Sequence, residues 1–101
     1  MKTHILCLGD SNTHGYCADP NDCADHGIRF NEEERWTCRL QKALGDEYLV
    51  TEEGLSGRTT VFVDPIHESM DALSVIYALL KSHEVIDLLT VSYTHLRAHE
   101  T

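Results

Sequence analysis

Short apolar runs alternate with segments of helical periodicity along this chain, and this alternation constrains its fold more than any other feature. Residues 4–8, 48–50 and 85–91 are apolar or β-branched runs of strand length. Helical patterns begin at Asn31 and at about Ser69. Strands that alternate with helices imply right-handed crossovers and a parallel sheet covered by helices. We therefore predict an α/β fold of three layers, flavodoxin-like, with three parallel strands in the order 2-1-3 and two long helices.

Capping residues and apolar spacing define the two long helices. Asn31 precedes Glu34 by three residues, a variant of the capping box, and predicts that the first helix begins there. Gly45 predicts its end. We expect one face of this helix to pack on the sheet, formed by Trp36, Leu40, Ala43 and Leu44. The second helix has apolar residues at the same kind of spacing: Met70, Leu73, Tyr77 and Leu80.

Two loops follow the carboxyl ends of the first two strands, where open parallel sheets bind ligands. Residues 9–31 are rich in turn-forming residues and predict a long loop, and residues 52–60 predict a second one. Ser11 stands at the exit of the first strand, where its hydroxyl would be presented as a nucleophile beside backbone N–H groups. The alternative is that the segment 9–15 only turns the chain or binds a phosphate group.

Several segments resemble one enzyme family, the SGNH or GDSL-like lipases and acylhydrolases. The resemblance covers residues 4–89 and is strongest to the branch that contains arylesterases and acyltransferases. It implies a serine esterase (acyl hydrolase) that cleaves short-chain or aryl carboxylic esters through an acyl-serine intermediate, with no cofactor and no metal. The segments that carry the resemblance are ILCLGDSNTHGY at 5–16, ERW at 34–36, EEGLSGRTT at 52–60, DP at 64–65 and SHEVIDL at 82–88.

The resemblance implies roles for four residues in these segments. Ser11 would be the catalytic nucleophile, and the backbone N–H groups of Ser11 and Gly57 would form the oxyanion hole. Asp10 and Asn12 would support the loop. The alternatives are that Asp10 only caps a turn and that Gly57 is needed only for its backbone conformation. We expect Arg58, in a loop beside Asp64, to form a partly solvated ion pair rather than to contact substrate.

The later catalytic blocks of the family are absent from the 101 residues. The family has an Asn in a Gly-x-Asn-Asp turn after the third strand and a late Asp-x-x-His that supplies the base. We therefore interpret residues 1–91 as the N-terminal part of an SGNH hydrolase domain and 92–101 as a non-native, adaptor-like tail. The chain itself is expected to be nearly inactive. The alternative to a truncated esterase is a gene fragment with no function of its own.

Other histidines are weaker candidates for the missing base. His14 lies three residues from Ser11, but Asp10 is the only evident carboxylate to orient it. The spacing Asp64-x-x-His67 imitates the family dyad, although it precedes the second helix. His95 and His99 share a helical spacing, but two ligands do not make a metal site.

Charge and hydropathy limit the partners and the location of the chain. Acidic residues number 17 against 8 Lys and Arg, a net charge of -9, which argues against binding to nucleic acid. No apolar run is long enough to cross a bilayer, and the apolar start is too short for a signal peptide. We expect a cytoplasmic protein with reduced cysteines that acts on a small-molecule ester substrate, without contact to a membrane. The open third strand predicts self-association.

Overall fold

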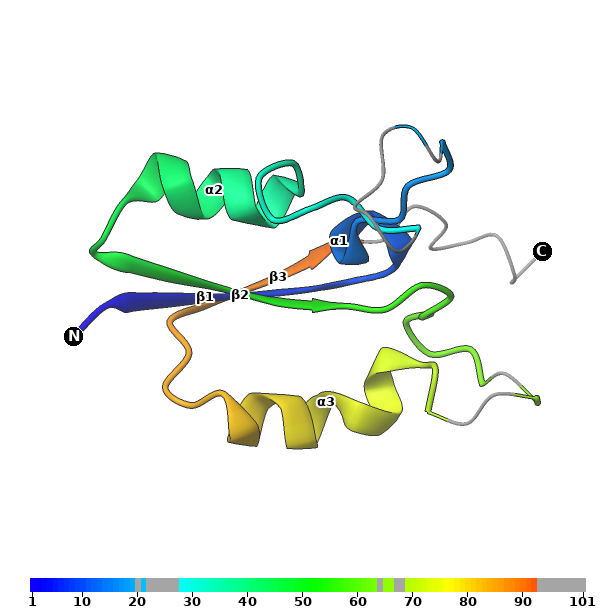
Figure 1. The fold of residues 1–101 in the computed structure, drawn as a ribbon. Helices are drawn as coiled ribbons and strands as arrows, with labels where there is room; N and C mark the ends of the chain where they lie inside the picture. The colour runs from blue at the N-terminus through cyan, green and yellow to red at the C-terminus, as the bar shows by residue number, and fades with distance from the viewer. Residues whose placement is uncertain (20, 22–27, 64, 67–68, 93–101) are drawn as a thin grey trace.

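The computed structural model describes residues 1–19, 21, 28–63, 65–66 and 69–92 of the chain. Within these residues the chain forms a small α/β unit in which strands and helices alternate (Figure 1). The elements in chain order are β1 (Thr3–Gly9), α1 (Ser11–His14), α2 (Trp36–Leu44), β2 (Tyr48–Gly54), α3 (Ala72–Ser82) and β3 (Leu88–Ser92).

The three strands form one parallel sheet in the order β2-β1-β3. This order confirms the prediction from the sequence. The register places Gly9 of β1 opposite Gly54 of β2 and opposite Ser92 of β3. All three carboxyl ends therefore lie level at one edge of the sheet, which is where ligands bind in folds of this kind.

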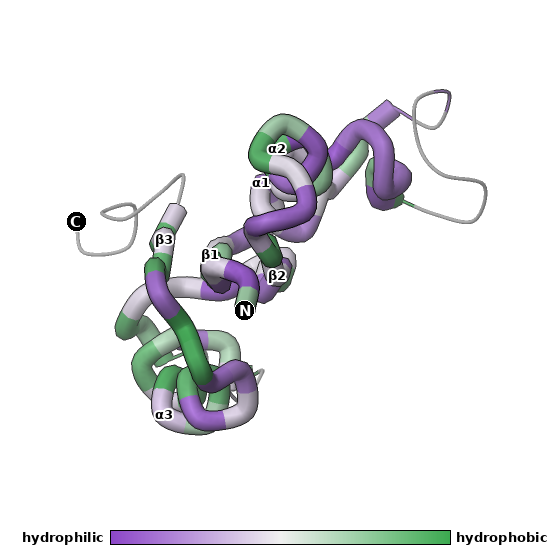
Figure 2. Tube along the Cα trace, turned by 90° about the vertical axis from the view of Figure 1, so that its left-hand side faces the viewer, coloured by the Kyte–Doolittle hydropathy of each residue, from purple (hydrophilic) through white to green (hydrophobic). Residues whose placement is uncertain are grey.

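Helices lie on both faces of the sheet and give the three layers that the alternation predicts. Helices α1 and α2 lie on one face and α3 lies on the other (Figures 1 and 2). The centre of the core is β1, because both of its neighbours pair with it. Its residues Ile5, Leu6, Cys7 and Leu8 are all buried. Burial also raises the pKa of the Cys7 thiol, as expected for a cysteine that serves as a small core residue.

Helix α2 begins five residues later than the sequence predicts. The residues after Asn31 form a turn in which the carbonyl of Asn31 accepts hydrogen bonds from the amides of Glu34 and Arg35. The Asn31 side chain caps this turn by accepting from Glu33 N at 2.9 Å. Arg35 then adopts an extended backbone, with φ -63° and ψ 139°, and the helix starts at Trp36. Asn31 is therefore a capping residue, but it caps this turn and not helix α2.

Three further boundaries differ from the prediction. The segment 9–31 is not loop throughout, because Asp10 and Gly15 cap the short helix α1. Strand β2 continues through Glu53 to Gly54, since these residues pair with β1. The run 85–91 contributes only its second half to β3, which starts at Leu88 and continues to Ser92.

The apolar positions of α3 are only partly covered. Leu73 is 64% exposed and Tyr77 is 75% exposed, whereas Ala72 is buried. The hydrophobic colour of α3 in Figure 2 shows the same apolar character over most of the helix. In the described part of the chain, no helix is long and apolar enough to span a bilayer. Cys7, Cys17 and Cys38 are free thiols, and Cys23 lies outside the described residues.

Candidate active site

The candidate nucleophile opens a short helix at the carboxyl end of the central strand. Ser11 is the first residue of α1 and is half-buried, directly after Asp10 at the end of β1. Asp10 is 8% exposed, and its side chain accepts a hydrogen bond from the amide of Asn12 at 3.1 Å. Its carbonyl accepts from the amides of Thr13 and His14. Asp10 therefore caps the turn that carries Ser11, while the Asn12 side chain is exposed.

Two glycines allow this turn to lie directly on the strand ends. A Cβ atom at Gly54 would stand 2.2 Å from the amide nitrogen of His14 and 2.5 Å from the carbonyl carbon of Thr13. A Cβ atom at Gly9 would meet the Thr13 hydroxyl at 2.2 Å and the carbonyl oxygen of Ser92 at 2.6 Å. Only glycine permits so close an approach of backbone to backbone. The glycines therefore bring α1 against the end of β2.

The second predicted loop leaves β2 at the same edge. The amide of Leu55 donates to the carbonyl of Gly9 at 3.2 Å, which ties the start of this loop to the end of β1. Gly57 follows with φ +87°, a conformation that glycine adopts without steric cost. A Cβ atom there would lie 3.1 Å from the Met70 side chain. Arg58 donates from Nη1 to the carbonyl of Glu53 at 2.7 Å.

Of the weaker histidine candidates for the base, His14 is the one that lies within the described residues. His14 Nδ1 donates to the carbonyl of Gly54 at 3.1 Å, so this ring links α1 to β2. Asp64, the predicted partner of Arg58, lies outside the described residues. His67, the second residue of the Asp64-x-x-His67 spacing, also lies outside them. His95 and His99 also lie outside them, in the segment 93–101. Among the described residues there is no group of three or more side chains that could hold a metal ion.

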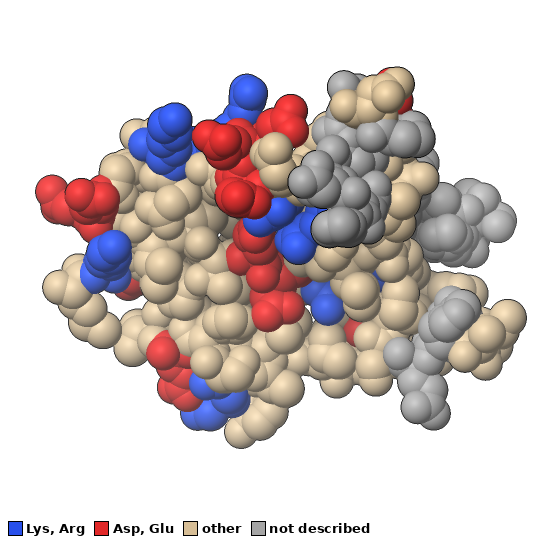
Figure 3. Space-filling view, viewed as in Figure 1, with Lys and Arg blue, Asp and Glu red and all other residues tan. Residues whose placement is uncertain are grey.

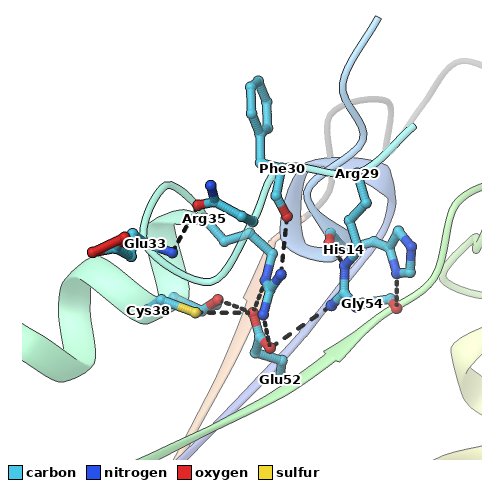
Figure 4. A network of polar contacts seen from close by, with 10 residues as sticks. His14, Arg29, Phe30, Glu33, Arg35, Cys38, Glu52 and Gly54 are labelled. Atoms are coloured by element: carbon cyan, nitrogen blue, oxygen red, sulfur yellow. Dashed lines mark hydrogen bonds and ion pairs between the residues drawn. The ribbon is translucent and has the colours of Figure 1, made fainter. Parts of the chain in front are cut away.

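Glu52, which the sequence pattern predicts to lie in a loop, is the centre of a polar network near this edge (Figure 4). Glu52 lies in β2 and accepts from Arg35 Nε at 2.8 Å and from Arg35 Nη2 at 3.3 Å. Arg29 Nη2 stands 3.7 Å from the same carboxylate, and the Thr37 hydroxyl donates a short hydrogen bond to it. The paired donors of one guanidinium give a bidentate ion pair.

The network shifts the pKa values of Glu52 and Arg35. Burial alone would raise the pKa of Glu52, but hydrogen bonds from Arg35 and Thr37 and the positive charges of Arg35 and Arg29 lower it below the ordinary value of 4.5. The hydrogen bond to Glu52 raises the pKa of Arg35 in turn. Glu52 is therefore ionised at neutral pH although it is only partly exposed.

Solved structures of esterases share this arrangement of strands and helices. The native aryl esterase of M. smegmatis is 36% identical to this chain and aligns with a TM-score of 0.81 over 93% of it. Est24, a carbohydrate acetylesterase from Sinorhizobium meliloti, is 34% identical and aligns with a TM-score of 0.83 over 94% of the chain. A carbohydrate acetylesterase family member from the same organism is 36% identical, with a TM-score of 0.75 over 95%. The fold is that of SGNH hydrolases.

The chain covers only part of these SGNH structures. It spans 43% of the aryl esterase, 43% of Est24 and 42% of the third protein. No protein-family model matches the sequence, and no curated protein matches it significantly. The fold and the relationship to esterases therefore rest on the alignment with the solved SGNH structures.

A cavity beside α2 lies apart from the candidate nucleophile. It has a volume of about 570 Å³ and is lined by residues of α2, the turn before it and β2, among them Cys38, Gln41 and Glu52. Neither Ser11 nor Gly57 lines it. In this SGNH fold the candidate site is instead the edge of the sheet where α1 lies against the end of β2 and the following loop begins.

Proposed function

We propose that this sequence encodes the nucleophile half of a serine esterase that cleaves short-chain or aryl carboxylic esters. The observation that carries the proposal is the place of Ser11, at the carboxyl end of β1 on a capped turn that lies against the end of β2. The similarity to an aryl esterase and to carbohydrate acetylesterases supports the same reaction class. Acyl transfer and hydrolysis share the first half of this reaction.

In the proposed reaction, the Ser11 hydroxyl attacks the ester carbonyl. The bond from Oγ to the carbonyl carbon forms, and the developing oxyanion accepts hydrogen bonds from the backbone N–H groups of Ser11 and Gly57. The ester C–O bond then breaks, and the alcohol leaves with the proton. Water attacks the acyl-serine and releases the carboxylic acid. Asp10 and Asn12 hold the turn on which these steps depend.

The chain by itself should turn over esters very slowly. It contains neither the Gly-x-Asn-Asp segment nor the late Asp-x-x-His of the family pattern. Loss of one oxyanion donor costs about two to three orders of magnitude in turnover, and loss of the base is at least as severe. We therefore test the site by covalent capture rather than by turnover.

The alternative of a phosphate-binding loop fits this edge less well. A phosphate group at the start of α1 would need the free amides of the turn. The carboxylate of Asp10 already accepts from the amide of Asn12 at this place. A phosphate group would have to displace this side-chain cap to reach the amide of Asn12, so the turn favours a neutral ester over a phosphate ester.

A fluorophosphonate ester tests the nucleophile directly. The bond from Oγ to phosphorus forms, the P–F bond breaks, and fluoride and the hydroxyl proton leave. We expect peptide mass spectrometry to find the adduct on Ser11 at least about tenfold sooner than on Ser56, an exposed serine of the neighbouring loop. The adduct should be absent from Ser11→Ala.

Two results would contradict the proposal. Equal labelling of Ser11 and Ser56 would show that the turn gives the Ser11 hydroxyl no advantage. Binding of inorganic phosphate that protects the amide of Asn12 from exchange, without labelling of Ser11, would favour the phosphate-binding alternative.

A further inference from the structure

The Glu52 network connects β2 to the C-terminal end of the short helix that carries the candidate nucleophile. The carboxylate of Glu52 is the common partner of two guanidinium groups, those of Arg29 and Arg35. Each guanidinium also donates to a backbone carbonyl beside α1. We propose that Glu52 is a positioning residue that fixes the Ser11 turn on the sheet through these two arginines. Its relevance to catalysis rests on the proposed function of Ser11.

The first connection runs through Arg29 to the end of α1. Arg29 Nε donates to the carbonyl of His14 at 2.6 Å, and His14 is the last residue of the helix. Carbonyl groups at the end of a helix lack partners within it and carry partial negative charge. Arg29 supplies both a donor and a positive charge at this place, while Glu52 keeps its guanidinium there.

The second connection runs through Arg35 to the loop that packs on α1. Arg35 Nη1 donates to the carbonyl of Phe30 at 2.9 Å, and the amide of Phe30 donates to the carbonyl of Gly15 at 2.7 Å. The stem of Arg35 also lies against Gly15, since a Cβ atom there would be 2.6 Å from Arg35 Cδ. Gly15 has φ +94° and ends α1. Arg35 thus holds the C-terminal end of α1, through Phe30 and through its packing against Gly15.

One carboxylate is needed to hold these two cations together. Figure 4 shows both guanidinium groups directed toward Glu52, and Figure 3 shows acidic and basic side chains gathered in the middle of this face. The side chains of Arg35 and Glu52 are only 12% and 23% exposed. Like charges at such short range repel unless an anion lies between them, and partial burial reduces screening by solvent. Removal of the Glu52 charge should therefore release Arg29, the more exposed of the two.

Hydrogen exchange tests this positioning without any need for catalysis. The amides of Gly15 and Tyr16 both donate to the carbonyl of Ser11, so their exchange reports on whether the turn is closed. In Glu52→Gln we expect these two amides to exchange roughly tenfold faster, while the amide of Leu6 in β1 is unchanged. The unchanged strand amide would show that the effect is local and not a loss of the whole fold.

The neighbouring strand residue provides a matched control. Glu53 follows Glu52 in β2, so its side chain lies on the opposite face of the sheet. There its Oε2 is 2.8 Å from His83 Nε2. Glu53→Gln removes an equal charge from the same strand and should leave the exchange of Gly15 and Tyr16 unchanged.

A second variant keeps the proposal testable if Glu52→Gln fails to fold. Arg29→Ala removes only the connection to His14, and its side chain is 39% exposed, so the core is not disturbed. It should accelerate exchange at Gly15 and Tyr16 as well. In the double variant the effects should not add, because both changes break the same connection. Exchange at wild-type rates in both single variants would overturn the proposal.

Two further readouts separate positioning from the proposed reaction. Labelling of Ser11 by the fluorophosphonate should slow by about ten- to a hundredfold in Glu52→Gln, since misplacement of about 1 Å has an effect of this size. The exchange difference between wild type and Glu52→Gln should also vanish as the pH falls and Glu52 is protonated. If wild-type Ser11 is not labelled at all, the proposed function fails, whereas the exchange rates still decide whether Glu52 positions the turn.

Discussion

At the scale of single residues, Glu52 makes the stability of the chain depend on pH in a definite direction. The folded state lowers the pKa of Glu52 below its ordinary value of 4.5. A lowered pKa contributes stability that is complete above the unfolded value and is lost as the pH falls through the folded value. We expect the free energy of unfolding in urea to decrease from pH 6 toward pH 3 more steeply in wild type than in Glu52→Gln.

The comparison of wild type with Glu52→Gln isolates the contribution of Glu52 from those of the other carboxylates. Asp71 also has a lowered pKa, because its side chain accepts hydrogen bonds from Ser74, and it contributes to acid sensitivity in both proteins. The difference between the two curves therefore belongs to Glu52 and its arginines. Parallel curves for wild type and Glu52→Gln would show that the ion pairs do not contribute to folding.

The residues of the candidate site differ in how far the sequence could locate them. Ser11 and Gly57 stand in segments whose glycines and place after apolar runs predict loops at a sheet edge. Glu52 was assigned to a loop because it opens residues 52–60, a polar segment with two glycines. Its partners, Arg29 and Arg35, are 23 and 17 residues away in the sequence. Their convergence depends on the path of the loop before α2, which no local pattern describes.

At the scale of elements, the contact between α1 and β2 depends on the absence of a side chain at Gly54. A methyl group there would overlap the backbone of Thr13 and His14, which cannot rotate away as a flexible side chain would. We expect Gly54→Ala to reduce the free energy of unfolding by about 1–3 kcal/mol, the usual cost of overpacking. Denaturation in urea, followed by circular dichroism, measures this loss.

Gly45 offers the control for Gly54→Ala. It has φ +85°, but a Cβ atom there would have nothing within 4 Å. Gly45→Ala therefore reports the conformational cost alone, about 1–3 kcal/mol for a backbone conformation that is essentially restricted to glycine. Exchange of the Gly15 and Tyr16 amides should accelerate in Gly54→Ala and not in Gly45→Ala. If Gly54→Ala leaves α1 protected, the close approach of α1 to β2 is not required.

The order of the elements followed from sequence periodicity, whereas their ends followed from contacts between elements. The run 4–8 predicted β1 almost to the residue, because it is buried on both sides and its apolar pattern is continuous. The start of α2 was wrong because Arg35 is held extended while its side chain binds Glu52. The end of β2 was wrong because pairing with β1 extends it through two glutamates. Both errors concern contacts between elements that are distant in the sequence.

At the scale of the whole molecule, the two outer strands of the sheet differ in how their edges are protected. Gln41 of α2 covers the edge of β2, donating from Nε2 to the carbonyl of Tyr48 and accepting at Oε1 from the amide of Val50, both at 2.8 Å. Within the described residues, no side chain makes an equivalent pair of bonds to β3. Leu88 and Val91 of β3 are 52% and 54% exposed. An apolar strand with an open edge is a site for pairing with another chain.

We therefore expect copies of the 101-residue chain to associate through β3. Size-exclusion chromatography with light scattering should show oligomers at about 100 μM that dissociate on dilution, because edge pairing is a weak, concentration-dependent contact. Val91→Lys should shift the protein toward monomer, since a lysine on an edge strand opposes pairing through charge repulsion. Val61→Lys is the matched control, because Val61 is 62% exposed but lies in the loop after β2. A wild-type chain that remains monomeric at this concentration, or a Val61→Lys chain that dissociates as fully as Val91→Lys, would exclude β3 as the interface.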